Sequence, residues 1–201
     1  MALRLPAFSP GQRIGLYGGS FNPAHEGHVA VAHQAIKRLQ LDHVWWLVSP
    51  QNPLKDSQDT ADFQERLQGV KNLVVNPAMV PTDLEQRLGT WCTAETFRRL
   101  RPVFNRGNFV WIMGADSFAE LHRWKDWRVI PETLPLAIFD RPGWRLKALA
   151  SKAARRYSAG RLTASDAALL PLMAPPAWVF LPMPLRHESS TAIRNRENGD
   201  R

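Results

Sequence analysis

A short apolar segment that ends in two glycines constrains the fold of this chain more than any other feature. Segment 13–17 is typical of a strand and leads directly into Gly18 and Gly19. After a loop, apolar residues recur at helical spacing: Val29, Ala32, Ile36 and Leu39. Segment 43–48, rich in Val and Trp, is then typical of a buried strand. A strand, a glycine loop, a helix and a second strand form a βαβ unit, which predicts parallel strands.

The same alternation continues along the rest of the chain. Further strands are predicted near Val74 or Met79 and at 109–113, 136–139 and 178–181, and helices at 60–70, 90–100 and 117–124. We expect Thr60 and Ser117 to begin two of these helices and Pro102 to stop the third. Because no internal repeat or low-complexity linker interrupts the pattern, we predict one α/β domain over 1–201, with its core at about 12–194. It is a Rossmann-like doubly wound parallel sheet with helices on both faces, and its ligand site lies where the strand order reverses.

Net charge and composition indicate which partners and which compartment to expect. Lys and Arg number 26 against 18 Asp and Glu, a net charge of +8 that favours anionic partners of any kind. The single Cys92 cannot form an internal disulfide, which favours a reducing compartment. Segment 168–185 is uncharged, but its five prolines argue against a membrane-spanning helix. We therefore expect a cytoplasmic protein with no membrane partner.

The loop 18–28 carries the strongest chemical signal. Two glycines let backbone amides approach an anion, and the helix that begins near His28 points its amino end at the same place. His25 and His28 lie three residues apart, so both imidazoles can donate to one phosphate chain. The glycines could instead form only a tight turn, and the histidines could be polar surface residues. Zinc binding is the weakest alternative, because the histidine spacing is not that of a zinc helix and no further ligands cluster nearby.

A second signal lies near the end of the sequence. Ser189, Ser190 and Thr191 predict a helix start whose hydroxyls can donate to phosphate oxygens. Arg194 follows one turn later and offers a guanidinium to the same anion. A capped helix with a surface arginine is the commoner explanation of this pattern alone. Its pairing with the first loop favours a phosphate site.

Together, His-x-Gly-His at 25–28 and Ser-Ser-Thr-x-x-Arg at 189–194 resemble the nucleotidylyltransferase superfamily. Gly-x-Asp-Ser at 114–117, Trp124 and Arg-Pro-Gly at 141–143 narrow the resemblance to the nicotinate-nucleotide adenylyltransferases. The matches follow in order along nearly the whole chain. The resemblance implies transfer of the adenylyl group of ATP to nicotinate mononucleotide, which gives nicotinate adenine dinucleotide and pyrophosphate in NAD biosynthesis.

The resemblance also implies roles for single residues. The catalytic residues it implies are His25, His28 and Arg194. The ATP-binding residues it implies are Gly18, Gly19, Ser20, Phe21, Gly114, Asp116, Ser189, Ser190 and Thr191. The acceptor-binding residues are Lys55, Thr93 and Trp124, with Trp124 stacked on the pyridine ring. The sequence departs from the family pattern at Asn22, Leu54 and Cys92, where Asp, His and Tyr are usual.

The expected mechanism is direct in-line transfer. A phosphate oxygen of the acceptor attacks the α-phosphorus of ATP. This oxygen is already anionic, so no general base is needed. We expect Mg²⁺ to bridge the phosphates, and the sequence identifies no protein side chain as its ligand. Two related alternatives are adenylyl transfer to nicotinamide mononucleotide or to phosphopantetheine. A nucleic-acid-binding module with a degenerate nucleotide site is an alternative of another class, but no run of interleaved aromatic and basic residues supports it. We expect ATP and nicotinate mononucleotide as partners, and no nucleic acid.

Overall fold

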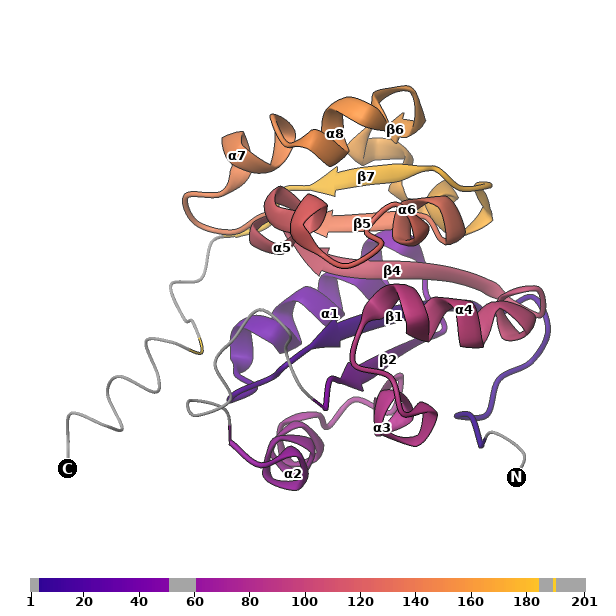
Figure 1. Ribbon diagram of the computed structural model, residues 1–201, viewed down its shortest axis with the longest axis vertical. Coiled ribbons are helices and arrows are strands. Elements are labelled where there is room, and N and C mark those ends of the chain that lie inside the picture. The colour runs from indigo at the N-terminus through magenta and orange to yellow at the C-terminus, as the bar shows by residue number, and fades with distance from the viewer. Residues whose placement is uncertain (1–3, 51–60, 185–189, 191–201) are drawn as a thin grey trace.

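The computed structural model describes residues 4–50, 61–184 and 190. They form one seven-stranded parallel sheet in the order β3-β2-β1-β4-β5-β7-β6. Figure 1 shows the strands from β2 to β6 in this order. The strands are β1 (Arg13–Gly19), β2 (His43–Val48), β3 (Met79–Thr82), β4 (Asn108–Gly114), β5 (Leu136–Phe139), β6 (Arg161–Leu162) and β7 (Trp178–Leu181). Strands β5 and β7 are buried throughout, because helices cover both faces of the sheet. The predicted doubly wound parallel α/β fold is confirmed.

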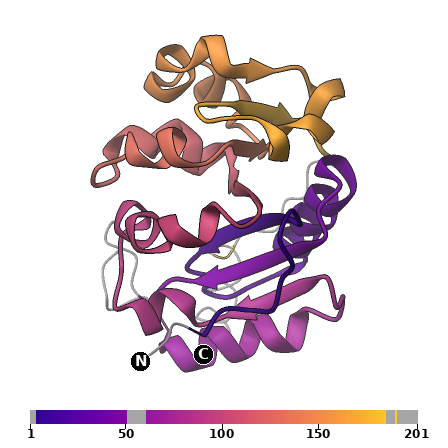
Figure 2. The same cartoon turned by 90° about the vertical axis from the view of Figure 1, so that its right-hand side faces the viewer.

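Helices form a layer on each face of the sheet (Figure 2). The α-helices are α1 (Glu26–Leu39), α2 (Phe63–Leu73), α3 (Leu84–Leu88), α4 (Thr93–Phe104), α5 (Ala115–Glu120), α6 (Val129–Thr133), α7 (Arg145–Leu149) and α8 (Lys152–Arg156). The 3-10 helices are η2 (Leu121–Arg123), η3 (Ser158–Gly160) and η4 (Ala164–Leu172). Apolar residues of α1, α2 and η4 pack in one core cluster, and those of α4 to α8 pack in a second cluster on the other face. Within the described ranges, no helix is long and apolar enough to cross a membrane.

The order of the strands reverses between β1 and β4. From β1 the chain passes through α1 to β2 on one side, and from β4 it passes through α5 to β5 on the other. Strands β1 and β4 each have a glycine at the carboxyl end, where a Cβ would collide with a neighbouring side chain. A Cβ on Gly18 would lie 2.1 Å from Cη2 of Trp111, and one on Gly114 would lie 2.3 Å from Oδ1 of Asp116. The predicted glycine loops therefore meet at the switch point, where doubly wound sheets bind their ligands.

One predicted helix start is confirmed and another was wrong. Helix α1 begins at Glu26, two residues before His28, because His25 caps it. Ser117 does not cap a helix that runs through Trp124. Gly114 is the N-cap of α5, so the chain turns into the helix directly from β4, and α5 ends at Glu120. A cap assignment from residue type alone overlooked this sharp strand-to-helix turn.

The helix predicted at 90–100 is shifted. Helix α4 begins at Thr93, and Pro102 lies inside it without ending it. Pro102 is exposed and two residues from the end, so its missing N–H removes only one late hydrogen bond. The packing of Phe97 and Leu100 in the core keeps the helix intact. Thr60 lies outside the described residues, and Asp62 caps α2.

Candidate active site

The start of α1 orients both histidines of the glycine-rich loop. His25 is the N-cap, and its Nδ1 accepts a hydrogen bond from the backbone N–H of Gly27 at 3.1 Å. Nδ1 of His28 accepts from the backbone N–H of His25 at 3.2 Å, and the two ring centroids are 3.9 Å apart. Because each Nδ1 is an acceptor, the proton of each neutral imidazole lies on Nε2. The cap therefore prepares two adjacent N–H donors of the kind that a polyphosphate requires.

The ring of Phe21 belongs to the core below this loop. Phe21 has a left-handed backbone with φ of 46°. Its ring packs against Tyr17 and Trp46 at centroid distances of 5.5 and 5.0 Å, and it packs against His28 at 5.2 Å. Only the main chain of Phe21 can therefore face a nucleotide in this conformation, together with Gly19 and Ser20.

Ser190, from the late hydroxyl-rich pattern, contacts the early loop. Ser190 Oγ donates a hydrogen bond to the carbonyl oxygen of Pro23 at 2.9 Å, across 167 positions of sequence. This contact places Ser190 beside the loop that carries His25 and His28. Four other predicted site residues lie outside the described residues: Lys55, Ser189, Thr191 and Arg194.

An acidic and a basic side chain face each other at the carboxyl end of β4. Asp116 Oδ1 is buried and has no hydrogen-bond partner within the described part of the chain, and Nε of Arg141 lies 3.7 Å from it. Burial raises the pKa of the nearby Tyr17 to about 12, although Arg141 opposes this rise. The Tyr17 hydroxyl is therefore neutral at physiological pH. Separately, Oδ1 of Asp116 is a buried acceptor at the switch point, where a ligand hydroxyl could donate to it.

Two predicted acceptor-binding residues come from neighbouring segments. Thr93 is the first residue of α4, and the half-buried Trp124 follows η2. The segments are joined by Cys92, whose Sγ lies 4.0 Å from the carbonyl oxygen of Lys125. Arg98 of α4 also forms a 2.8 Å ion pair with Asp126. The structure thus brings the start of α4 and the Trp124 loop together.

Comparison with known proteins agrees with this geometry. Residues 16–196 match the Cytidylyltransferase-like family. A protein of Caulobacter sp. (strain K31), named "Probable nicotinate-nucleotide adenylyltransferase", is 51% identical over 92% of this chain and 98% of its own length. A protein of the same name from Parvibaculum lavamentivorans is 47% identical over 96% of each chain. The chain belongs to the nicotinate-nucleotide adenylyltransferase family.

A solved structure supports the fold of this adenylyltransferase. The Plasmodium falciparum nicotinic acid mononucleotide adenylyltransferase complexed with NaAD superposes with a TM-score of 0.67. The match covers 92% of this chain and 83% of the other at 15% sequence identity. At this identity the similarity concerns the fold alone. The family resemblance predicted from the sequence motifs is confirmed by the relatives.

Sequence reasoning missed Arg66 of the adenylyltransferase. Arg66 is 4% exposed, and its guanidinium donates to four carbonyl oxygens. They belong to Ser20 at 2.6 Å, Ser49 at 2.8 Å, Pro50 at 2.9 Å and Ala61 at 3.0 Å. Burial lowers the pKa of Arg66, and Asp62 opposes this shift. Arg66 thus ties the glycine-rich loop 18–28, called the nucleotide loop below after its predicted role, to the end of β2. The available signal was an arginine on the apolar face of its helix, beside Phe63 and Leu67.

Sequence reasoning also missed the buried carboxyl of Glu85, which is 2% exposed. Ser49 Oγ donates to its Oε2 at 2.7 Å, and Thr96 Oγ1 donates to its Oε1 at 3.0 Å. Burial raises the pKa of Glu85, and these two hydrogen bonds oppose the rise. Among the described residues, no ion pair compensates the charge. A lone glutamate in a polar stretch gave no signal of burial.

The raised pKa of Glu85 predicts a pH dependence of stability. Between its unfolded value near 4.5 and its higher folded value, the folded protein binds more protons, so stability falls as pH rises. The contribution is fully present below 4.5 and is lost as pH passes the folded pKa. Glu85→Gln removes this titrating carboxyl. The free energy of unfolding of the wild type, measured by urea denaturation, should therefore fall relative to that of the variant as pH rises. A difference that is constant with pH would contradict the shift.

Proposed function

We propose that this protein transfers the adenylyl group of ATP to nicotinate mononucleotide, as the names of its relatives indicate. The observation that carries the proposal is the contact of Ser190 Oγ with the Pro23 carbonyl oxygen at 2.9 Å. It supports one site for a polyphosphate, with the imidazoles of His25 and His28 on one side and the hydroxyl-rich segment on the other. Arg194, Ser189 and Thr191 belong to the second side in this proposal.

The proposed reaction is a single in-line displacement. A phosphate oxygen of nicotinate mononucleotide attacks the α-phosphorus of ATP and forms a new P–O bond. The bond from the α-phosphorus to the bridging oxygen breaks, and pyrophosphate leaves with that electron pair. The backbone of Gly18 to Phe21, the amino end of α1 and the Nε2–H donors of His25 and His28 stabilise the charge that moves onto the leaving phosphates. The attacking oxygen carries no proton, so no base is required.

We propose that ATP enters with Mg²⁺. The described residues contain no group of three or more His, Cys, Asp or Glu side chains that could hold a metal ion. In this proposal the ion would be held mainly by the triphosphate, which is how Mg²⁺ commonly binds with nucleotides. Such an ion would supply positive charge to the phosphates. Gly114 and Asp116 lie beside the nucleotide sugars in this proposal.

On the acceptor side, Lys55 assists the phosphates, Thr93 faces the pyridine carboxylate and Trp124 stacks on the pyridine ring. Trp124→Ala should raise the KM for nicotinate mononucleotide about fivefold, because stacking contributes about 1 kcal/mol. The KM for ATP should stay unchanged and serves as the internal control in steady-state kinetics. An unchanged KM for the pyridine substrate would contradict the stacking role.

The function is tested by incubation with ATP, Mg²⁺ and nicotinate mononucleotide, followed by mass detection of the dinucleotide. Parallel reactions contain nicotinamide mononucleotide or phosphopantetheine. We expect the highest kcat/KM with nicotinate mononucleotide. A higher value with another acceptor would reassign the substrate. Tight RNA binding with a steep salt dependence and no adenylyl transfer would refute the proposed function.

A further inference from the structure

The side chain of Glu85 lies between segments that the proposed function assigns to different substrates. Ser49, at the end of β2, donates its backbone N–H to the Gly19 carbonyl oxygen in the nucleotide loop at 3.0 Å. Its hydroxyl donates to Glu85 Oε2 at 2.7 Å. The other carboxyl oxygen of Glu85 accepts from Thr96 of α4 at 3.0 Å. A continuous chain of hydrogen bonds therefore runs from the nucleotide loop to the acceptor-side helix.

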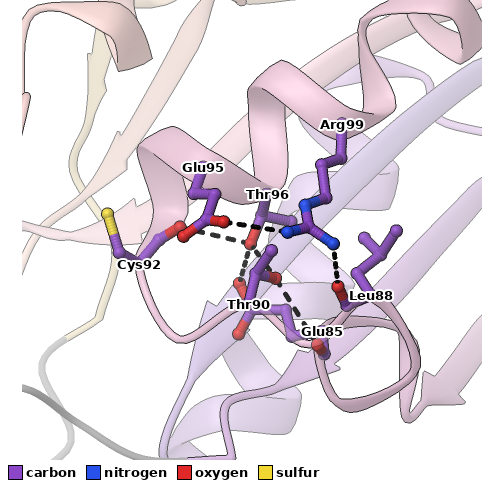
Figure 3. A network of polar contacts seen from close by, with 7 residues as sticks. All are labelled: Glu85, Leu88, Thr90, Cys92, Glu95, Thr96 and Arg99. Atoms are coloured by element: carbon purple, nitrogen blue, oxygen red, sulfur yellow. Dashed lines mark hydrogen bonds and ion pairs between the residues drawn. The ribbon is translucent and has the colours of Figure 1, made fainter.

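The first turn of α4 depends on this network. Its N-cap, Cys92, makes no side-chain cap hydrogen bond. Thr96, one turn after Thr93, donates to Glu85, and its Oγ1 lies 2.7 Å from Oγ1 of Thr90. The backbone N–H of Thr90 in turn donates to the carbonyl oxygen of Glu85 at 3.0 Å. Figure 3 shows Thr96 and Thr90 gathered around Glu85 beneath the start of the helix.

A second contact between α4 and the α3 region lies at the surface and serves as a comparison. Arg99 pairs with Glu95 at 3.1 Å, and its guanidinium also donates to the carbonyl oxygen of Leu88 (Figure 3). The side chains of Arg99 and Glu95 are 49% and 32% exposed, so water competes for this contact. The hydrogen bond between Thr96 and Glu85 is buried and the one between Ser49 and Glu85 is part-buried, so water competes less for them. Glu85 is thus better placed than Arg99 to fix the helix.

We propose that Glu85 is a positioning residue for adenylyl transfer. Through Ser49 and Thr96 it sets the position of the start of α4, with Thr93, relative to the nucleotide loop. This inference rests on the proposed function, because that function assigns Thr93 to the acceptor. Transfer depends on the distance between two bound substrates, and small displacements of a substrate-positioning element are enough to reduce it.

Thr96→Val provides the test, because it removes the link to α4 while keeping the shape of the side chain. Glu85→Ala is less useful, since the cavity and the unpaired hydroxyls that it leaves can prevent folding. Thr96→Val should raise the KM for nicotinate mononucleotide by up to about tenfold, because displacement of Thr93 weakens contacts that hold this substrate. The KM for ATP should change by less than about twofold. Thr96→Ser, which keeps the hydroxyl, should restore the KM of the wild type.

Glu95→Gln is the matched control. It also weakens one polar contact of α4, one residue away, but at the exposed pair with Arg99. It should leave both KM values unchanged. A Thr96→Val variant with a lowered Tm but wild-type KM values for both substrates would overturn the proposal, since Glu85 would then be only structural.

Hydrogen exchange of the backbone amides at the start of α4 separates this inference from the proposed function. Thr96→Val should accelerate this exchange about tenfold relative to Glu95→Gln, with no change in β2. If the wild-type protein forms no dinucleotide, the proposed function is wrong, and accelerated exchange still supports the role of Glu85 in placing α4. Unchanged exchange overturns that role, whatever the activity.

Discussion

Replacing His28 with alanine is expected to lower the kcat of adenylyl transfer by about 100- to 1000-fold. This is the effect of removing one preorganised donor from the charge that develops in a transition state. His28 Nδ1 accepts the backbone N–H of His25 at 3.2 Å, so the ring proton lies on Nε2, which is the donor to phosphate in the proposed function. Steady-state kinetics with ATP and nicotinate mononucleotide measure the loss.

Two further variants separate the donor role of His28 from its role in the helix cap. His28→Asn keeps an acceptor for the His25 N–H but has no group at the position of Nε2, so it should lose as much turnover as alanine. His33→Ala alters an exposed histidine on the same helix and should have no effect on turnover. A His28→Asn variant with near-normal kcat would show that the residue acts only as a cap.

Replacing Arg66 with methionine is expected to lower the free energy of unfolding by about 3–5 kcal/mol. The variant removes a buried guanidinium that donates to four part-buried carbonyl oxygens, and losing four such hydrogen bonds is more destabilising than losing one exposed contact. Two of these carbonyls belong to Ser20 and Ser49, so the nucleotide loop also loses its link to the end of β2. Urea denaturation gives the stability, and the KM for ATP is expected to rise.

Arg98→Met is the control for Arg66. Arg98 pairs with Asp126 at 2.8 Å, but the two side chains are 52% and 44% exposed, so the expected loss is about 0–1 kcal/mol. Equal losses in the two variants would mean that the Arg66 hydrogen bonds contribute no more than a surface ion pair. The assignment of Arg66 as the residue that holds the loop would then be wrong.

Much of the fold was predictable because its signals are local. The apolar segments at 43–48, 136–139 and 178–181 are strands in the structure, as predicted. Gly18 and Gly114 were predicted to end two strands at one site, and both lie at the switch point between β1 and β4. Helix boundaries were less predictable. Ser117 has the chemistry of a cap, but the turn at Gly114 decides where α5 begins.

The residues of the candidate site likewise fall into those that the sequence predicted and those that only the structure showed. The sequence by itself predicted which residues contact phosphate, such as His25 and His28, because their spacing and the neighbouring glycines are a local pattern. Only the tertiary structure decided that Arg66 holds the loop and that Glu85 is buried between β2 and α4. Those roles depend on contacts between residues as far apart as Ser20 and Arg66 or Ser49 and Glu85. The physical reason is that local propensity is written in neighbouring residues, whereas burial and hydrogen-bond partners arise only when distant segments pack together.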